Sequence, residues 1–373
     1  MKEIIIIGTL TDKFGGRTGG IAVHVEQLAS ELSRKGFIVT VYSDTCITTR
    51  SCNGFDVIGV KNKLSTIKTF LVNPVKSIVR LIKRDLIGIK KLTLKRILSQ
   101  SHKPAETVIH VHSLHNSLID DEIMFEFDCI FTDHGFWQAK DYNNELIQHR
   151  IEKSKGIISV SKYAQKILLS EFSIPETSKL YVVHNPVLMR SIVMGNDKSR
   201  EHVFFNGLSE SIERKGFLDF LYLTESNFGD KFVAIVDNRA KSYCEKLSIN
   251  NLEIKGKCNL DEVNGIYDKS KAMVLPSRSE SFGLVYIEAA LSGVPVIGYK
   301  PVIDEFNNIL NIDIGLPFDP ENEDKHDLLD KYRELMSTKY DHEEIYEAIK
   351  CHLGWFNQID KFILIYKSKN ESI

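Results

Sequence analysis

The chain has 373 residues, of which 43% are hydrophobic and 26% charged, and its formal net charge is −2. This is the composition of a soluble globular protein too long for one ordinary core, and it predicts two domains of about 100 to 200 residues each. It offers no candidate for a transmembrane helix, because no stretch reaches the roughly 18 apolar residues that such a helix needs.

Six cysteines are scattered along the chain without a C-x-x-C pair or metal-ligand spacing, which favours reduced and mostly buried thiols. The apolar run from Ile4 to Ile7 is too short for the core of a signal peptide and is typical of a first buried strand. We therefore expect a cytoplasmic protein.

Short apolar runs alternate with helical patterns along the chain, which is typical of a parallel α/β fold. In the first half, strands are predicted near 4–8, 37–42, 55–60, 108–112, 129–132, 156–160 and 181–183. In the second half, they are predicted near 203–205, 232–236, 252–255, 272–275 and 294–297. A polar stretch with Pro186, Gly195 and Asn196 interrupts the periodicity and predicts a linker over 186–201.

A glycine-containing loop follows the first predicted strand. It includes Gly19 and Gly20 and leads into a predicted helix over 21–35. Such a turn can cradle an anion, because backbone N–H groups and the helix dipole both point at it. A plain flexible loop explains the letters GGRTGG equally simply, so both interpretations are open.

Residues 61–103 form a strongly basic segment, with twelve Lys or Arg residues against Asp85, a net charge of +11 that leaves −13 for the rest of the chain. Apolar residues recur at helical spacing from Val75 to Ile89. Basic residues that lie largely off this stripe include Lys83, Arg84, Lys90 and Lys91. One interpretation is a solvated helix packed on its own domain; we favour docking on an anionic membrane surface. Nucleic-acid binding is disfavoured, because aromatic residues are not interleaved through the segment.

Histidines gather near two predicted strand ends. His134 follows the strand at 129–132, where a structural role and a role in the site are both open. His110 and His112 share one face of a strand, and His115 follows them. Because no acidic or thiol ligand accompanies this group, we predict no metal site.

The segment Pro276 to Ile297 carries two glutamates eight residues apart, Glu280 in a loop at the carboxyl end of a predicted strand and Glu288 inside the following helix. Amides near Gly283 would point into the same crevice, where the helix dipole favours an anion. Carboxylates suit a ligand rich in hydroxyls. Together they indicate a nucleotide-sugar site, with phosphate on amides and sugar on carboxylates.

The letters PSRSESFGLVYIEAALSGVPVI resemble the E-x7-E signature of retaining glycosyltransferases of family 4, the GT-B type with two Rossmann-like domains. Similar family segments are GGIAVHVEQLASEL, FTDHG and NGLSESIERKG. The resemblance implies an α/β fold of two Rossmann-like parallel-sheet domains facing across a cleft. The N-terminal acceptor-binding domain would span 1–185 and the nucleotide-sugar-binding domain 202–345, and the C-terminal helical region 346–373 would cross back to the first domain.

The resemblance also implies site residues. Catalytic roles fall to Glu280, His134 and Lys215, with His134 beside the hydroxyls of the transferred sugar and His112 on the acceptor side. The implied donor-binding residues are Gly19, Gly20, Arg214, Lys215, Lys257, Ser281, Phe282, Gly283, Leu284 and Glu288. Leu208 stands where the family has an arginine. Whether Arg214 replaces that arginine or faces solvent is open.

These residues imply a retaining transferase that moves a hexosyl group from a nucleotide-diphosphate sugar to a lipid-linked or membrane-associated glycan, as in polysaccharide, O-antigen or lipopolysaccharide assembly. No metal and no cofactor is expected, and the expected location is the cytoplasmic face of the membrane. Two alternatives are a nucleotide-sugar epimerase of the same fold and a non-catalytic nucleotide-sugar-binding partner that docks on a membrane.

Overall fold

The computed structural model describes residues 2–11, 13, 19–43, 46, 50–59, 86–116, 118–135, 144–175, 179–189, 200–208, 210–226, 229–247 and 249–368. The chain forms two compact units. The first unit contains residues 1–185 and 358–373, and the second contains residues 186–357. Among the described residues, no helix combines the length and the apolar character needed to cross a membrane.

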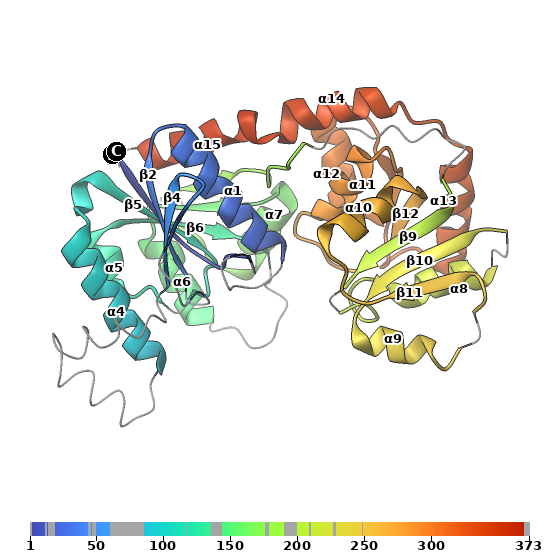
Figure 1. Ribbon diagram of the computed structural model, residues 1–373, viewed down its shortest axis with the longest axis horizontal. Helices are drawn as coiled ribbons and strands as arrows, with labels where there is room; N and C mark the ends of the chain where they lie inside the picture. The colour runs from blue at the N-terminus through green and yellow to red at the C-terminus, as the bar shows by residue number, and fades with distance from the viewer. Residues whose placement is uncertain are drawn as a thin grey trace. The chain divides into compact units, whose positions relative to one another are not determined.

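The first unit is built on an eight-stranded sheet in the order β3-β4-β2-β1-β5-β6-β7-β8 (Figure 1). Neighbouring strands are parallel except β3 and β4, which are antiparallel. The strands are β1 Glu3–Ile7, β2 Ile38–Ser43, β3 Arg50–Cys52, β4 Phe55–Gly59, β5 Thr107–His112, β6 Asp128–Asp133, β7 Gly156–Ser159 and β8 Leu180–Val182. The seven strands predicted for this half all form, with ends displaced by no more than one residue.

β3 was not predicted, although its signal is in the sequence. Asn53 and Gly54 connect β3 to β4 with φ values of 53° and 83°, the left-handed conformations of a tight hairpin turn. Asn-Gly between two extended segments is a strong hairpin signal. A search for this dipeptide would therefore have found the extra strand.

Helices cover both faces of the first sheet (Figure 1). They are α1 Gly20–Arg34, α4 Leu86–Ser101, α5 Asp121–Glu126, α6 Asn144–Lys153, α7 Lys162–Glu171, the short 3₁₀ turn Pro104–Glu106, and α15 Trp355–Lys367. The apolar face of α15 is buried, with Ile359, Phe362 and Tyr366 each at most 1% exposed. Of the predicted basic segment, residues 61–85, which include Lys83 and Arg84, lie outside the described residues, whereas Lys90 and Lys91 lie on α4.

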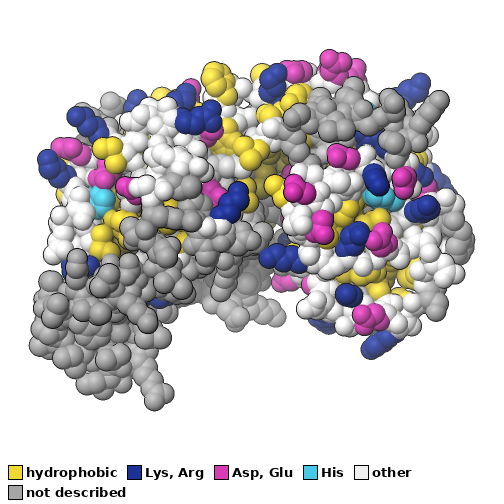
Figure 2. All heavy atoms as spheres, viewed as in Figure 1, with side chains coloured by type: hydrophobic (Ala, Val, Ile, Leu, Met, Phe, Trp, Pro, Cys, Tyr) yellow, Lys and Arg dark blue, Asp and Glu magenta, His cyan; other side chains and the backbone are white. Residues whose placement is uncertain are grey.

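The second unit is a six-stranded, fully parallel sheet in the order β11-β10-β9-β12-β13-β14. The strands are β9 His202–Gly207, β10 Lys231–Val236, β11 Leu252–Lys255, β12 Ser270–Leu275, β13 Val296–Tyr299 and β14 Gly315–Phe318. The helices are α8 Phe217–Ser226, α9 Asn238–Cys244, α10 Leu260–Asp268, α11 Leu284–Leu291, α12 Lys300–Leu310, α13 Lys325–Ser337 and α14 His342–Leu353. Acidic and basic side chains are interspersed on the face of this unit drawn in Figure 2.

Two details of the second unit differ from the prediction. The strand expected at 294–297 begins at Val296, because the N–H of Val294 instead donates to Ala289 O at 3.0 Å and closes the end of α11. β14 was not predicted. It is a four-residue edge strand that contains Pro317, and proline weakens a strand signal although sheet edges tolerate it.

The boundary at the end of the chain also differs from the expected one. The C-terminal region was expected to begin at 346, but α14 packs on α11 and α12, and the second unit continues to Asn357. Near the predicted linker, Arg200 donates to the carbonyls of Ser270 at 2.6 Å and Ser292 at 3.0 Å, so it is anchored within the second unit. Residues 190–199 lie outside the described residues.

Each sheet has one point where the chain order reverses direction, between β1 and β5 in the first unit and between β9 and β12 in the second. Ligands of open α/β sheets bind beyond the carboxyl ends of strands at such points. The loops after β1, β5, β9 and β12 are therefore the places where the topology directs a search for the site.

Candidate active site

Two loops meet at the reversal point of the second sheet. One is the turn from Leu208 to Gly216 after β9, and the other runs from Pro276 to Gly283 after β12. Arg278 N–H donates to Arg214 O at 2.7 Å, which ties the loops together. Gly216 has φ +73°, and an added Cβ would lie 2.1 Å from Pro276 O. Only glycine permits this contact.

Asp237, which follows the neighbouring strand β10, holds the turn after β9 in place. Its carboxylate accepts from the N–H of Ser211 at 2.8 Å and from the N–H of Ala240 at 2.9 Å, and Ser211 Oγ accepts from Asp237 N–H at 2.9 Å. Burial alone would raise the pKa of Asp237, but these hydrogen bonds lower it below its ordinary value. The carboxylate therefore stays ionised and keeps the turn in one conformation.

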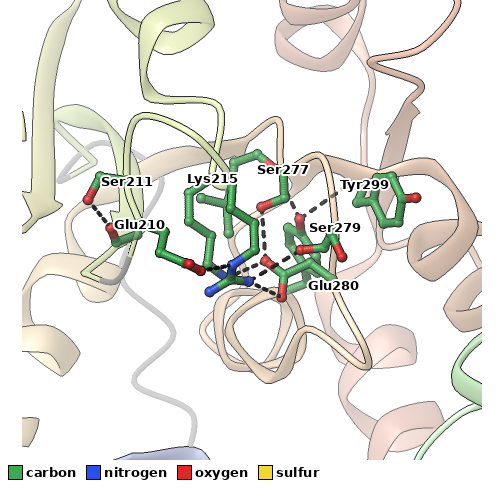
Figure 3. A network of polar contacts seen from close by, with 11 residues as sticks. Glu210, Ser211, Lys215, Ser277, Ser279, Glu280 and Tyr299 are labelled. Atoms are coloured by element: carbon green, nitrogen blue, oxygen red, sulfur yellow. Dashed lines mark hydrogen bonds and ion pairs between the residues drawn. The ribbon is translucent and has the colours of Figure 1, made fainter. Parts of the chain in front are cut away.

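Glu280 is the residue on which the polar side chains of both loops converge (Figure 3). Its side chain is buried, and the residue is 9% exposed. Lys215 Nζ donates to Oε1, and Ser277 Oγ donates to the same oxygen at 2.9 Å. Arg214 Nη1 lies 3.9 Å from Oε2. The structure thus brings Lys215 to a glutamate that lies 65 positions later in the sequence.

Arg214 does not simply face solvent. Its Nε donates to Glu210 Oε2 at 2.5 Å, and its Nη1 donates to Ser279 O at 3.3 Å. Glu210 is in the left-handed region with φ 51°, and its carbonyl accepts from the N–H groups of both Arg214 and Lys215. Arg214 is therefore fixed beside Lys215, so two cations flank one buried carboxylate.

The loop after β12 ends at the start of α11, where Gly283 is the N-cap with φ +71°. A Cβ on Gly283 would meet the ring of Tyr286 at 2.5 Å. The N–H groups of Gly283 and Leu284 have no acceptor within the helix by their position, as anion binding requires. Phe282, in contrast, turns its side chain into the core, 4.9 Å from the ring of Phe306. Ser281 lies in the same loop.

Tyr286 fixes the strand ends next to this loop through its hydroxyl. Its hydroxyl donates to Leu275 O at 3.0 Å and accepts from the N–H of Tyr299 at 3.1 Å. Burial, together with the nearby Glu280 carboxylate, raises the pKa of Tyr286, so the hydroxyl keeps its proton. The end of β12 and the start of β13 are linked through one side chain.

Glu288 lies on α11 and is contacted by a residue that the sequence analysis missed. The hydroxyl of Tyr267 lies 3.5 Å from Glu288 Oε2 and 3.3 Å from Val285 O, and it accepts from Asn206 Nδ2 at 3.2 Å. Tyr267 is fully buried. A tyrosine hydroxyl in a buried helix position needs a polar partner, and this is the signal that could have drawn attention to it.

The other predicted donor-binding residues are Lys257 in the second unit and Gly19 and Gly20 in the first. Lys257 is exposed in the loop after β11, two strands away from β9. Gly19 and Gly20 begin α1 in the first unit, and Gly19 O accepts from Val23 N–H at 3.2 Å. Of the loop that precedes them, 14–18 lie outside the described residues.

Four buried histidines gather at the reversal point of the first sheet: His24 on α1, His110 and His112 on β5, and His134 after β6. His112 Nδ1 lies 3.1 Å from His134 Nε2, and the two rings are nearly parallel. The ring of His24 lies 5.3 Å from that of His112 and 5.7 Å from that of His134. His24 was not predicted, because only the packing of α1 brings it to the two strand ends.

His110 belongs to the same cluster but is held by other partners. Its Nδ1 is 2.7 Å from the hydroxyl of Tyr366 on α15, and its Nε2 is 2.6 Å from Thr132 Oγ1. Both ring nitrogens are thus in hydrogen bonds, so His110 serves structure. His112 Nε2 is buried and has no hydrogen-bond partner within the described part of the chain.

Burial keeps the histidine cluster neutral. It lowers the pKa of His134 to about 4 and that of His110 to about 3, with the neighbouring His134 adding to the effect on His110. Burial and the surrounding imidazoles also lower the pKa values of His24 and His112 well below the ordinary value. At neutral pH, His134 can therefore both accept and donate a hydrogen bond.

In the ranges that the structure describes, no group of three or more His, Cys, Asp or Glu side chains is arranged to hold a metal ion. The histidine cluster illustrates why: its nitrogens bind one another, Tyr366 and Thr132 rather than converging on one point. The positive charge at the candidate site comes from Lys215 and Arg214.

Two family profiles match the chain. The profile of Glycosyltransferase Family 4 matches residues 18–188, and that of glycosyl transferases group 1 matches residues 225–350. An uncharacterized glycosyltransferase of Methanocaldococcus jannaschii is 26% identical over 204 residues, which cover 52% of this chain and 53% of the relative. The O-antigen chain mannosyltransferase RfbU of Salmonella typhimurium is 24% identical over 166 residues, which cover 42% and 46%. The chain thus spans about half the length of these relatives.

Solved structures share the fold over nearly the whole chain. TarM superposes with a TM-score of 0.72 at 11% identity, covering 99% of each chain. WaaG, a glycosyltransferase involved in lipopolysaccharide biosynthesis, superposes with a TM-score of 0.65 at 12% identity, covering 98% of this chain and 100% of that one. With two parallel-sheet units and two matching profiles in succession, the chain belongs to the glycosyltransferases of the GT-B type, with a family 4 first domain and a group 1 second domain.

Proposed function

We propose that this protein transfers a hexosyl group, with retention of configuration, from a nucleotide-diphosphate sugar to a hydroxyl of a lipid-linked glycan. The observation that supports the donor most directly is the pair of cations, Lys215 and Arg214, fixed beside Glu280 at the reversal point of the second sheet. A diphosphate carries several negative charges close together. It can therefore pair with two adjacent cations and with the N–H groups at the start of α11.

In this proposal Lys215 and Arg214 exchange partners when the donor binds. Without donor, Lys215 is paired with Glu280 and Arg214 with Glu210. A bound diphosphate would draw both cations toward its oxygens and release part of the Glu280 carboxylate for the sugar hydroxyls. The cations then neutralise the departing diphosphate, so the sugar can develop positive charge as its bond to phosphate lengthens.

The acceptor hydroxyl would attack on the face that the diphosphate leaves, and a phosphate oxygen would take its proton. Glu280 holds the transferred sugar, Glu288 holds the ribose of the donor, and His134 contacts the sugar hydroxyls. Burial supports the role of His134, because a neutral imidazole can donate through one nitrogen and accept through the other. Arg214 supplies the charge of the family arginine that Leu208 replaces.

A glycan acceptor of the lipopolysaccharide or O-antigen kind is supported by two similar proteins, the mannosyltransferase RfbU and the lipopolysaccharide glycosyltransferase WaaG. Such acceptors are attached to lipid, so the enzyme has to work at a membrane surface. The basic segment 61–103 offers the charge for this. On α4, Lys90 and Lys91 are half-buried.

Binding to anionic vesicles tests the membrane part of the proposal. The full chain should bind vesicles that contain phosphatidylglycerol, and binding should weaken as salt is added. Reversing Lys83, Arg84, Lys90 and Lys91 to Glu should reduce it by about a thousandfold, because each basic residue near such a surface contributes about 1 kcal/mol. The matched control reverses four exposed lysines of the second unit, Lys241, Lys246, Lys339 and Lys350. Equal loss in both variants would overturn the membrane proposal.

The donor and the reaction are tested with a panel of nucleotide sugars. One member should raise the free energy of unfolding by about 2.7 kcal/mol at a hundred times its dissociation constant. That donor, mixed with an acceptor extract, should then give a glycosylated product and free nucleoside diphosphate. An epimerase would instead convert the donor without any acceptor. A binding partner without activity would be stabilised by the donor but give no product.

A further inference from the structure

Three elements of the second unit converge on Glu288, and their contacts form a chain. Asn206 is the second-last residue of β9, Tyr267 lies on α10, and Glu288 lies on α11. Asn206 Nδ2 donates to the Tyr267 hydroxyl at 3.2 Å, and that hydroxyl faces Glu288 Oε2 at 3.5 Å and Val285 O at 3.3 Å. The chain starts at the carboxyl end of a central strand and ends at a carboxylate beside the candidate site.

The direction of these hydrogen bonds follows from the atoms involved. A phenol has one proton, and Asn206 uses the phenol oxygen as an acceptor. The proton of Tyr267 can therefore be donated to Glu288 or to Val285 O. Val285 O already accepts within the helix from the residue one turn later. The ionised carboxylate is the stronger acceptor, because hydrogen bonds to charged groups are about twice as strong as neutral ones.

Packing fixes where the Tyr267 hydroxyl can lie. The ring is fully buried and meets the ring of Phe204 edge to face at 5.2 Å, with an interplanar angle of 82°. Glu288, in contrast, is only partly buried, and its side chain leans toward the start of α11 as helical side chains do. A rigid donor thus faces a partly buried carboxylate.

We propose that Tyr267 is a positioning residue that orients the Glu288 carboxylate toward the ribose hydroxyls of the donor. This inference rests on the proposed function, in which Glu288 binds the ribose. Tyr267 itself does not touch the nucleotide. Its hydroxyl restricts one carboxylate oxygen, so that the other presents its lone pairs to the ribose, and Asn206 keeps the tyrosine proton pointed away from the strand end.

The test measures how strongly the full-length protein prefers ribose to 2′-deoxyribose. Dissociation constants are measured by calorimetry for UDP, GDP and ADP and for their 2′-deoxy forms. For the base that binds, the wild-type protein should prefer the ribonucleotide by at least about tenfold, the factor that 1.4 kcal/mol gives. Tyr267→Phe should reduce that preference to about twofold by weakening the ribonucleotide alone. Asn206→Asp should do the same, because a carboxylate there would take the tyrosine proton.

A stability control separates positioning from folding. Tyr332 on α13 is another buried tyrosine of this unit, and its hydroxyl donates to Asp230 Oδ2 at 2.6 Å. Tyr332→Phe should lower the melting temperature to a similar extent but leave the ribose preference at the wild-type value. A loss of the preference in Tyr332→Phe as well would show that Tyr267 acts only through stability and would overturn the inference.

Glu288→Gln distinguishes failure of the inference from failure of the proposed function. If Glu288→Gln loses the ribose preference and Tyr267→Phe keeps it, the carboxylate binds ribose without help from the tyrosine, and only the inference is wrong. If both variants keep the preference, or if no nucleotide binds the wild-type protein, both the ribose assignment and the inference are overturned.

Discussion

Glu280→Gln is expected to lower kcat for sugar transfer by about a thousandfold, a loss of roughly 4 kcal/mol of transition-state stabilisation. Glutamine keeps the size of glutamate, and its carbonyl oxygen can still accept from Ser277 and Lys215. What disappears is the negative charge, which in the proposed mechanism holds the sugar hydroxyls and stabilises positive charge on the sugar. Rates measured at saturating donor and acceptor check this expectation.

The fold should survive the substitution at a moderate cost. Glu280 is the buried partner of Lys215, whose side chain is 12% exposed, so the lysine would keep a neutral hydrogen-bond acceptor but lose its counter-charge. Removing one partner of a fully buried ion pair costs about 3–5 kcal/mol. Partial exposure and the retained hydrogen bond place the expected cost below that range. Circular dichroism and thermal unfolding give this number independently of the rate.

A second lysine–carboxylate–hydroxyl cluster in the same unit provides a matched control. Asp230 pairs with Lys271 at 2.5 Å and accepts from the Tyr332 hydroxyl at 2.6 Å, and it lies away from the loops after β9 and β12. Asp230→Asn removes the same kind of charge from the same kind of surroundings. It should cost similar stability. Because Asp230 lies away from the two loops of the site, kcat should stay within about threefold of the wild-type value. Wild-type activity in Glu280→Gln would show that the site is elsewhere.

The strands could be predicted because a buried parallel strand has a local sequence signal, a continuous apolar run such as Ile4 to Ile7. The loop after β12 was equally legible, because a strand, a glycine and a helix follow one another between Ala272 and Leu291. These features depend on neighbours in the sequence. The order of the strands in each sheet, and with it the reversal points, was not among the predictions.

The partners of the site residues could not be predicted, because they come from distant parts of the chain. Arg214 could be assigned to the site only once the loop after β12 was seen to lie against the turn that carries it. Tyr267 reaches Glu288 from a different helix, 21 residues earlier. Such contacts are decided by the packing of elements, and no periodicity within one element records them.

Acidification is expected to unfold the first unit before the second, because the buried histidine cluster opposes protonation. In the unfolded chain each imidazole takes up a proton near pH 6.5. In the fold, burial lowers the pKa of His134 to about 4 and that of His110 to about 3, and those of His24 and His112 are lowered as well. Between pH 6.5 and about 4 only the unfolded chain binds these protons, so stability falls as the pH falls through this range.

The size of the effect follows from the same pKa values. Each histidine with so lowered a pKa costs up to about 1.4 kcal/mol per pH unit below 6.5, so His110 and His134 alone remove roughly 4 kcal/mol by pH 5. His24 and His112 act in the same direction. A domain is stable by only about 5–15 kcal/mol, so this is a large fraction of the total. The Tyr366 and Thr132 hydroxyls that face His110 carry no charge in this range and do not offset the loss.

The fall in stability can be measured separately for the two units by hydrogen exchange and mass spectrometry at pH values from 7.5 to 5. The exchange rates are corrected for the intrinsic effect of pH. Peptides from β5 and β6 should lose protection as the pH falls, while peptides from β9 and β12 should lose less, although burial also lowers the pKa of His202 on β9. His110→Gln keeps a polar side chain between Tyr366 and Thr132 but cannot be protonated, so it should flatten the pH dependence by about 1.4 kcal/mol per unit. His352→Gln, at an exposed position on α14, should leave the dependence as it is. Equal protection of the first unit at pH 7.5 and pH 5 would mean that the cluster accepts protons without unfolding, and the neutral imidazole assigned to His134 would then have to be abandoned.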